Sequence, residues 1–142
     1  MMKEERLKAI VKGILCQYLE YTDRVSDIQM QITEVRSRLD SAKAIRYDKE
    51  PGGSAGISHD EQLVIMIERV DELEKLKKGY SDTAEAIRKK FRIDSLSDTE
   101  YLVLDTVYRT KTYSEAGEKI GYSTVQIYRI MNKIYRKLSL YI

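Results

Sequence analysis

The sequence predicts an all-α protein, in which a long, coiled-coil-like N-terminal helical hairpin precedes a C-terminal three-helix unit of the helix-turn-helix type. Apolar residues recur every 3.5 positions through the first 42 residues, as in helices that pack along one seam. Four Ser/Thr-x-x-Glu/Gln patterns mark helix starts in the rest of the chain. One Pro, seven Gly and 34% charged residues are typical of a folded helical chain rather than a disordered one.

The first helix is expected to cover most of the first fifty residues. Its apolar positions advance in alternating steps of four and three, which predicts a supercoiled helix packed against another helix. At ~1.5 Å per residue it would be roughly 60 Å long. The positions are Leu7, Val11, Ile14, Tyr18, Tyr21, Val25, Ile28, Ile32, Val35, Leu39 and Ala42.

A loop is expected at residues 50–58, because this stretch holds the only Pro and three of the seven Gly. The Ser58-x-x-Glu61 pattern then restarts a helix. Its apolar positions are Leu63, Met66, Ile67, Val70, Leu73, Leu76, Tyr80, Ala84, Ile87 and Phe91.

Two helices of similar length joined by a short loop predict an antiparallel hairpin over residues 1–92. Two helices alone give a thin core, so we expect a further partner, either a second copy or the C-terminal unit folded back. The sequence interpretation favours a homo-oligomer formed through residues 7–91.

The C-terminal unit, residues 95–142, is expected to contain three short helices. Ser97-x-x-Glu100 opens the first, whose expected buried side is Tyr101, Leu102, Leu104, Val107 and Tyr108. Thr112-x-x-Glu115 caps the second, and Gly121 ends it because glycine tolerates positive φ. Ser123-x-x-Gln126 starts the third, which is expected to run to about Leu140.

The second and third of these helices have the spacing of a helix-turn-helix. Ala116 is small where the helices must approach, and Gly121 occupies the turn. The expected buried stripe of the last helix is Ile127, Ile130, Ile134 and Leu138. The opposite stripe is Val125, Arg129, Asn132 and Arg136, flanked by Tyr128 and Lys133.

This outward stripe indicates binding to double-stranded DNA. From Lys119 to Ile142 there are five basic residues and no acidic one, although the net charge of the chain is only +2. Arg can read guanine and Asn can read adenine in the major groove, while a helix start suits a phosphate oxygen. The predicted DNA-binding residues are Lys111, Thr112, Ser123, Thr124, Val125, Gln126, Tyr128, Arg129, Asn132, Lys133, Arg136 and Lys137.

Residues 95–140 resemble region four of bacterial sigma factors, and the whole chain is similar to the RinA- and ArpU-type late-gene activators of phages of Gram-positive bacteria. The resemblance implies regulation of phage or mobile-element transcription through the last helix, and leaves open whether RNA polymerase is contacted. It places Thr124, Gln126, Tyr128, Arg129, Asn132 and Lys133 on the solvent face. Gly117 departs from the pattern, because such helices carry Ala or a larger residue there; glycine costs a helix ~1 kcal/mol.

The sequence predicts no enzyme activity, no cofactor and no metal site. His59 and Cys16 are the only histidine and cysteine, too few for a zinc cluster or an intrachain disulfide. No apolar run approaches the ~20 residues that cross a bilayer, and charges near the start argue against an export signal, so a cytoplasmic location in a bacterial host cell is expected. The alternative to a transcription regulator is a coiled-coil assembly or DNA-packaging adaptor with a basic helical surface.

Overall fold

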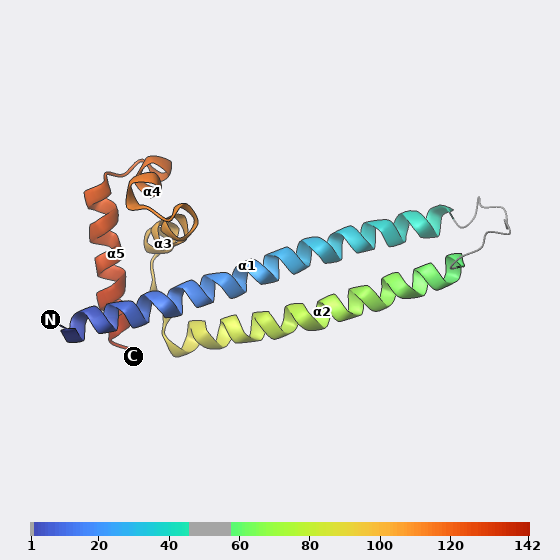
Figure 1. Cartoon of the computed structure of the whole chain (residues 1–142), viewed down its shortest axis with the longest axis horizontal. Coiled ribbons are helices and arrows are strands. Elements are labelled where there is room, and N and C mark those ends of the chain that lie inside the picture. The colour runs from blue at the N-terminus through green and yellow to red at the C-terminus, as the bar shows by residue number, and fades with distance from the viewer. Residues whose placement is uncertain (1, 46–57) are drawn as a thin grey trace. The chain divides into compact units, whose positions relative to one another are not determined.

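The computed structural model describes residues 2–45 and 58–142, and these residues confirm the all-α class, with five α-helices and no strand among them (Figure 1). The loop predicted at 50–58 lies outside the described residues, apart from Ser58. The elements are α1 (Met2–Ile45), α2 (His59–Lys90), the 3-10 turn η1 (Ile93–Ser95), α3 (Asp98–Thr110), α4 (Tyr113–Ile120) and α5 (Thr124–Ser139). In this described part no helix is long and apolar enough to span a bilayer.

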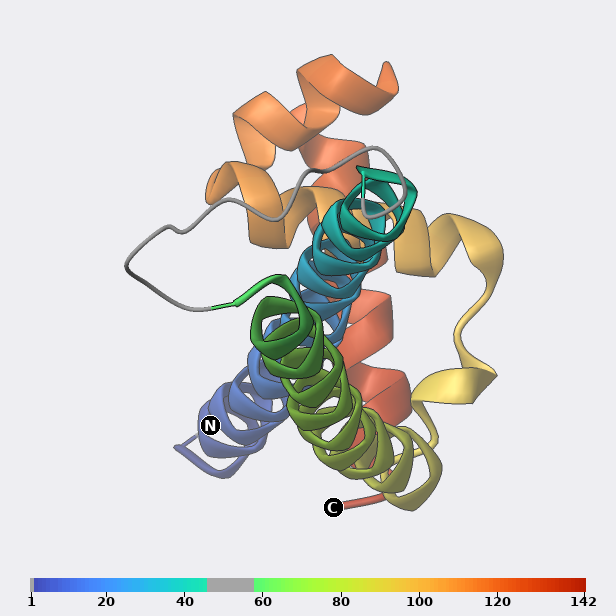
Figure 2. The same cartoon turned by 90° about the vertical axis from the view of Figure 1, so that its right-hand side faces the viewer.

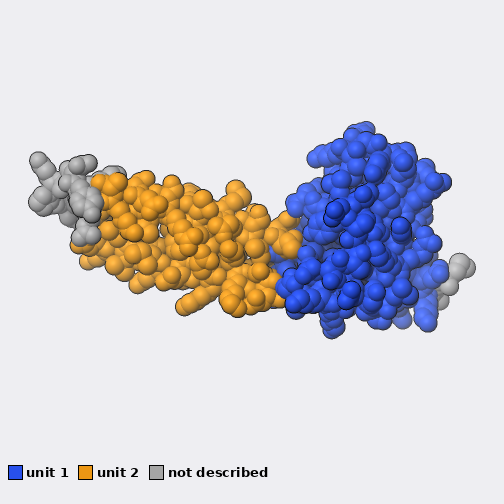
Figure 3. Space-filling model, turned by 180° about the vertical axis from the view of Figure 1, so that it is seen from behind, with its two compact units in different colours: residues 1–21, 83–142 blue, residues 22–82 orange. Residues whose placement is uncertain are grey.

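The chain divides into two compact units, shown in different colours in Figure 3. Unit 1 comprises residues 1–21 and 83–142, and unit 2 comprises residues 22–82. The start of α1 therefore belongs to the same compact unit as the C-terminal helices. This corresponds to the alternative in which the C-terminal unit folds back onto the first helix.

Unit 2 contains residues 22–45 of α1 and residues 59–82 of α2, which run side by side in Figure 1 and Figure 2. Ile28 and Ile32 of α1 form an apolar cluster with Val70 and Leu73 of α2. All of these are positions of the predicted apolar repeats. The 3.5-residue period keeps one stripe of α1 turned toward its neighbour, as the sequence predicted.

Polar contacts at the edges of this cluster show the direction of the two segments. The Arg24 guanidinium donates to the Tyr80 hydroxyl at 3.1 Å, and the Arg36 guanidinium pairs with the Glu74 carboxylate at 3.0 Å. As the residue number rises on α1 it falls on α2, so the segments are antiparallel. Because the Arg36–Glu74 pair is exposed, it contributes about 0–1 kcal/mol, and the apolar cluster dominates.

Unit 1 has a larger core, to which the stretch of α1 from Val11 to Leu19 contributes. Val11, Leu15, Tyr18 and Leu19 are buried in one cluster with side chains of α2, α3, α4 and α5. Leu15 and Leu19 do not belong to the predicted seam. They are buried because this part of α1 is covered on more than one face, which a single heptad repeat does not reveal.

The helices α3, α4 and α5 contact one another pairwise and begin where the capping patterns predicted. The Ser97 hydroxyl accepts from the Glu100 backbone N–H at 3.1 Å, and the Glu100 carboxylate accepts from the Ser97 N–H at 2.9 Å. The expected buried side of α3 was wrong at one position: Leu102 is exposed, and Val103 is fully buried instead. Val103 and Leu104 share a face with Val107 one turn later, whereas Leu102 points off it.

Candidate nucleic-acid interface

The turn between α4 and α5 is tight, and two glycines make it so. Gly121 has a φ of +90°, which favours glycine. The carbonyl of Gly117 accepts hydrogen bonds from the N–H groups of Gly121, at 2.8 Å, and Tyr122, at 2.9 Å, as in a Schellman motif. A Cβ at Gly117 would lie 2.5 Å from the Tyr122 carbonyl oxygen. Gly117 is therefore required by the close approach of the turn, which explains its departure from the expected pattern.

The start of α5 is fixed by a capping box. The Ser123 hydroxyl accepts from the Gln126 N–H at 3.2 Å, and the Gln126 side-chain oxygen accepts from the Ser123 N–H at 2.9 Å. Both were predicted as DNA-binding residues. Their oxygens are engaged in ordering the first turn, so we assign them a positioning role at the surface.

Between Thr124 and Lys133, α5 exposes side chains that were expected to face DNA. Thr124, Arg129 and Lys133 are exposed, and Val125 and Tyr128 are 57% and 52% exposed despite their apolar character. Within the described part of the chain, neither Arg129 nor Lys133 pairs with a carboxylate. Two cations and an apolar side chain thus lie accessible beside the turn, with no acidic residue on α5 to oppose an anion.

Asn132 lies next on the same stripe, but it is half-buried. The Lys8 ammonium of α1 donates to the Asn132 side-chain oxygen at 3.1 Å. The same ammonium lies 5.8 Å from the centre of the Tyr128 ring and 5.3 Å from that of Tyr135, within cation–π range. Lys8 was not among the predicted site residues. No local signal could identify it, because 124 positions separate it from Asn132.

The end of α5 differs from its beginning, because acidic residues lie near it. Arg136 is exposed, yet it shares a groove of about 600 Å³ with Glu4 and Glu5 of α1. These carboxylates disfavour a phosphate beside Arg136. The stretch of α5 from Thr124 to Lys133 is consequently better placed than its end to contact a phosphate.

Lys137 has an intramolecular partner. Its ammonium donates to the Ser95 carbonyl at 2.7 Å and to the Glu100 carboxylate at 3.1 Å. Glu100 is only 5% exposed. Burial raises the pKa of Glu100, but the hydrogen bonds from the Ser97 N–H and from Lys137 outweigh it and leave that pKa below its ordinary value. Lys137 is thus placed to neutralise a buried carboxylate.

Lys111 and Thr112 lie in the link between α3 and α4. Lys111 has a φ of +70°, and its ammonium lies 4.5 Å from the centre of the Tyr108 ring. The Thr112 hydroxyl accepts from the Glu115 N–H at 3.2 Å and so caps α4. The next residue, Tyr113, places its ring centre 6.3 Å from that of Tyr128. This aromatic contact connects the start of α4 to the exposed half of α5.

Comparison with models of protein families, with curated proteins and with solved structures finds no match to this chain.

Proposed function

We propose that this chain is a sequence-specific, double-stranded-DNA-binding transcription regulator of phage or mobile-element genes, in which α4 and α5 form a helix-turn-helix and α5 enters the major groove. The single observation that carries the proposal is the exposed stretch of α5 from Thr124 to Lys133. There Arg129 and Lys133 stand unpaired within the described part of the chain, on a helix without a carboxylate. Recognition helices contact base edges through their N-terminal residues. The accessible stretch of α5 likewise begins at its N-terminus.

Each exposed residue type in this stretch of α5 has a counterpart on DNA. A guanidinium can donate two hydrogen bonds to guanine, and the methyl groups of Val125 can contact thymine. The Lys133 ammonium suits a phosphate oxygen, as do the N–H groups at the start of α5. The residues we place in contact with bases are Thr124, Val125, Tyr128 and Arg129; Lys133, Lys111 and Thr112 are placed toward the backbone.

The resemblance to region four of sigma factors and to phage late-gene activators supports the biological setting of the proposal. It supports the arrangement of a helical hairpin followed by a helix-turn-helix unit as well. Two features support the helix-turn-helix: the three-residue turn from Gly121 to Ser123, and the capped start of α5. Contact with RNA polymerase is part of the same proposal, since that family acts on transcription.

The experiment is a binding titration on a preferred site that is first selected from random duplexes. Arg129→Ala should weaken binding to this site by about 1–3 kcal/mol and relax the preference at one or two base pairs. Lys133→Ala is the matched control from the same face. It should weaken all sequences alike and reduce the slope of log affinity against log salt by about one. Equal weakening of selected and scrambled DNA by Arg129→Ala would contradict base reading.

A second candidate is an assembly or DNA-packaging adaptor. It is favoured by the apolar side chains that α2 exposes in unit 2, namely Val64, Ile65, Ile67 and Leu76. Exposed apolar groups of this kind mark protein contacts. Under this alternative, selection from random duplexes returns no consensus, and Arg129→Ala and Lys133→Ala both reduce only salt-dependent, sequence-independent binding.

A further inference from the structure

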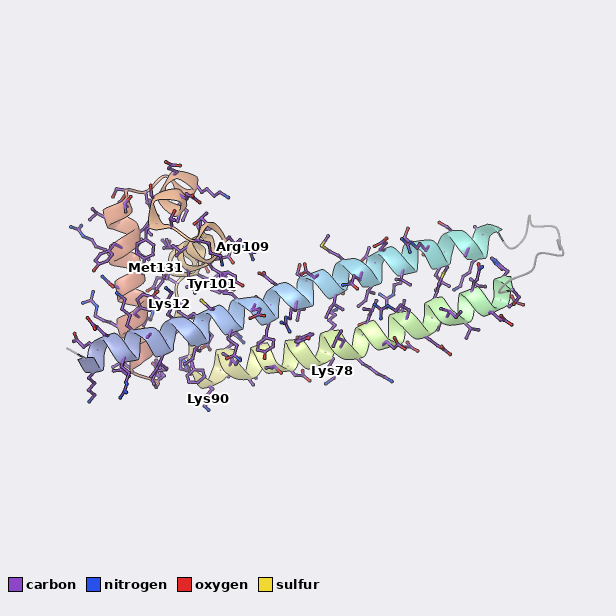
Figure 4. All side chains as sticks on the ribbon, viewed as in Figure 1. Lys12, Lys78, Lys90, Tyr101, Arg109 and Met131 are labelled. Carbon is purple, nitrogen blue, oxygen red and sulfur yellow. The ribbon has the colours of Figure 1, made fainter. Side chains whose placement is uncertain are left out.

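Unit 1 contains an apolar pocket that lies apart from the outer face of α5. It has a volume of about 230 Å³ and is lined by α1, α3, α5, the link between α3 and α4, and the first residue of α4. Leu15, Leu104 and Met131 provide apolar walls. Figure 4 labels two of its lining residues, Lys12 on α1 and Met131 on α5, which lie where these helices come together. The volume is below the ~300–1,000 Å³ of pockets for drug-sized ligands, so it suits a small one.

The charges at this pocket are of one sign. Lys12 and Lys111 both line it, and none of its lining residues is acidic. Neither ammonium pairs with a carboxylate within residues 2–45 and 58–142. Burial, followed by the neighbouring Tyr113, raises the pKa of the Tyr135 phenol above its ordinary value, so this lining residue stays neutral at physiological pH. An anion placed here would meet two cations and no negative charge.

We propose that this pocket binds a small organic monocarboxylate with an apolar body. The body would lie against Leu15, Leu104 and Met131, and the carboxylate would lie between Lys12 and Lys111. The mixture of apolar walls and a few polar groups is what small-molecule sites use for affinity and orientation. This assignment goes beyond DNA binding and does not rest on it, since Lys111 is the one lining residue that is also proposed to lie toward DNA.

Cys16 makes the proposal testable, because it is the only cysteine, is exposed and lines the pocket. Its alkylation by neutral iodoacetamide can be followed by intact mass in the full chain. The probe is 3-phenylpropionate, and its uncharged analogue 3-phenylpropanol is the control. We expect the acid to slow alkylation in a saturable manner. The alcohol should need about a fivefold higher concentration for the same effect, because it lacks the ion pairs.

Substitution of each lysine tests whether its ammonium group recognises the carboxylate of the probe. Lys12→Met and Lys111→Met keep most of the side chain and should each raise the half-protecting concentration of the acid by up to about fivefold. Lys3→Met removes an exposed lysine from the same helix outside the pocket lining, and should leave protection unchanged. Equal protection by acid and alcohol, or the same shift in Lys3→Met as in Lys12→Met, would overturn the assignment of a carboxylate.

A second measurement decides whether the probe enters the pocket. Met131 is buried in the core of unit 1 and lines the pocket, so its ¹³C-labelled methyl resonance should move when 3-phenylpropionate binds. With five methionines in the chain, Met131→Leu suffices to assign the signal. A Met131 resonance that stays in place up to the solubility limit of the acid overturns the proposal even where Cys16 is protected, because protection then arises outside the pocket.

Discussion

Glu100 of α3 and Lys137 of α5 form an ion pair in which the carboxylate is buried. The Glu100 carboxylate is buried and receives the Ser97 N–H and the Lys137 ammonium, while its second oxygen has no partner among the described residues. A buried carboxylate that loses its cation is strongly destabilising, because the charge stays away from water. Lys137 was predicted to contact phosphate. In the structure its ammonium connects the end of α5 to Ser95 and to Glu100 of α3.

Lys137→Met should therefore lower the free energy of unfolding by roughly 2–3 kcal/mol at neutral pH, since a charge-assisted hydrogen bond is lost and Glu100 stays buried. The pKa of Glu100 is depressed in the folded state, so its contribution to stability is present above the ordinary value of 4.5 and is lost as pH falls through the folded value. Urea unfolding across pH should show the difference shrinking in acid. Lys133→Met, exposed on the same helix, is the control and should change stability little.

Three glycines offer a second test at the residue scale, because each stands in a different environment. At Gly117 a Cβ would meet the Tyr122 carbonyl at 2.5 Å; at Gly121 there is space but φ is +90°; at Gly13, within α1, there is space and no positive φ. We expect Gly117→Ala to be the most destabilising, Gly121→Ala to cost ~1 kcal/mol, and Gly13→Ala to stabilise by ~0.5–1 kcal/mol. Thermal unfolding of the three variants gives the order directly, and a neutral Gly117→Ala would contradict the tight turn.

At the scale of elements, the features that sequence predicted best were local ones. The caps at Ser97, Thr112 and Ser123 lie where the patterns placed them, because a capping box depends only on residues three positions apart. The buried stripe of α5 was confirmed at Ile127, Ile134 and Leu138 and is wider than predicted, since Met131 and Tyr135 are buried too. A helix contacted by more than one neighbour buries more than a single stripe.

Long-range packing was predicted least well. Leu15 and Leu19 fall outside the heptad seam, yet they are among the most buried side chains. Lys8 contacts Asn132 although neither position carries a signal that relates it to the other. A heptad repeat indicates that a helix has a partner, but which side chains meet a second partner depends on tertiary contacts alone. The exposed stripe of α5 could thus be predicted in its own residues, but the side chains that α1 places beside it could not.

Leu15 provides the prediction at this scale. Leu15→Ala should lower the free energy of unfolding by about 2–5 kcal/mol, because it leaves a cavity in the core of unit 1. Ile10→Ala in the same helix removes a 42% exposed side chain and should cost much less. Hydrogen exchange should show the loss of protection in α3 and α5 as well as in α1. Exchange that accelerates in α1 alone would mean that the C-terminal helices are stable without it.

At the scale of the whole molecule, self-association through the long helices is the remaining prediction from the sequence. Ile28 and Ile32 are buried against Val70 and Leu73 of the same chain, so charges introduced there would unfold unit 2 and would not test association. The exposed apolar residues of α2 are better placed. Val64, Ile65 and Ile67 lie within two turns and are each about half exposed. Apolar side chains clustered in this way are typical of surfaces that a second copy covers.

We therefore expect this chain to sediment as a dimer at tens of micromolar, and the double variant Val64→Asp, Ile65→Asp to sediment as a monomer of about 16.6 kDa. The physical reason is that two carboxylates would be buried without partners at the dimer contact, while in the monomer they remain in water. Helicity by circular dichroism should be unchanged in the variant, which separates dissociation from unfolding. Glu68→Ala and Glu72→Ala, exposed changes on the same helix, should leave the mass unaltered. A wild-type chain that sediments as a monomer would exclude a dimer at these concentrations, and the exposed side chains of α2 would then have to serve a different partner.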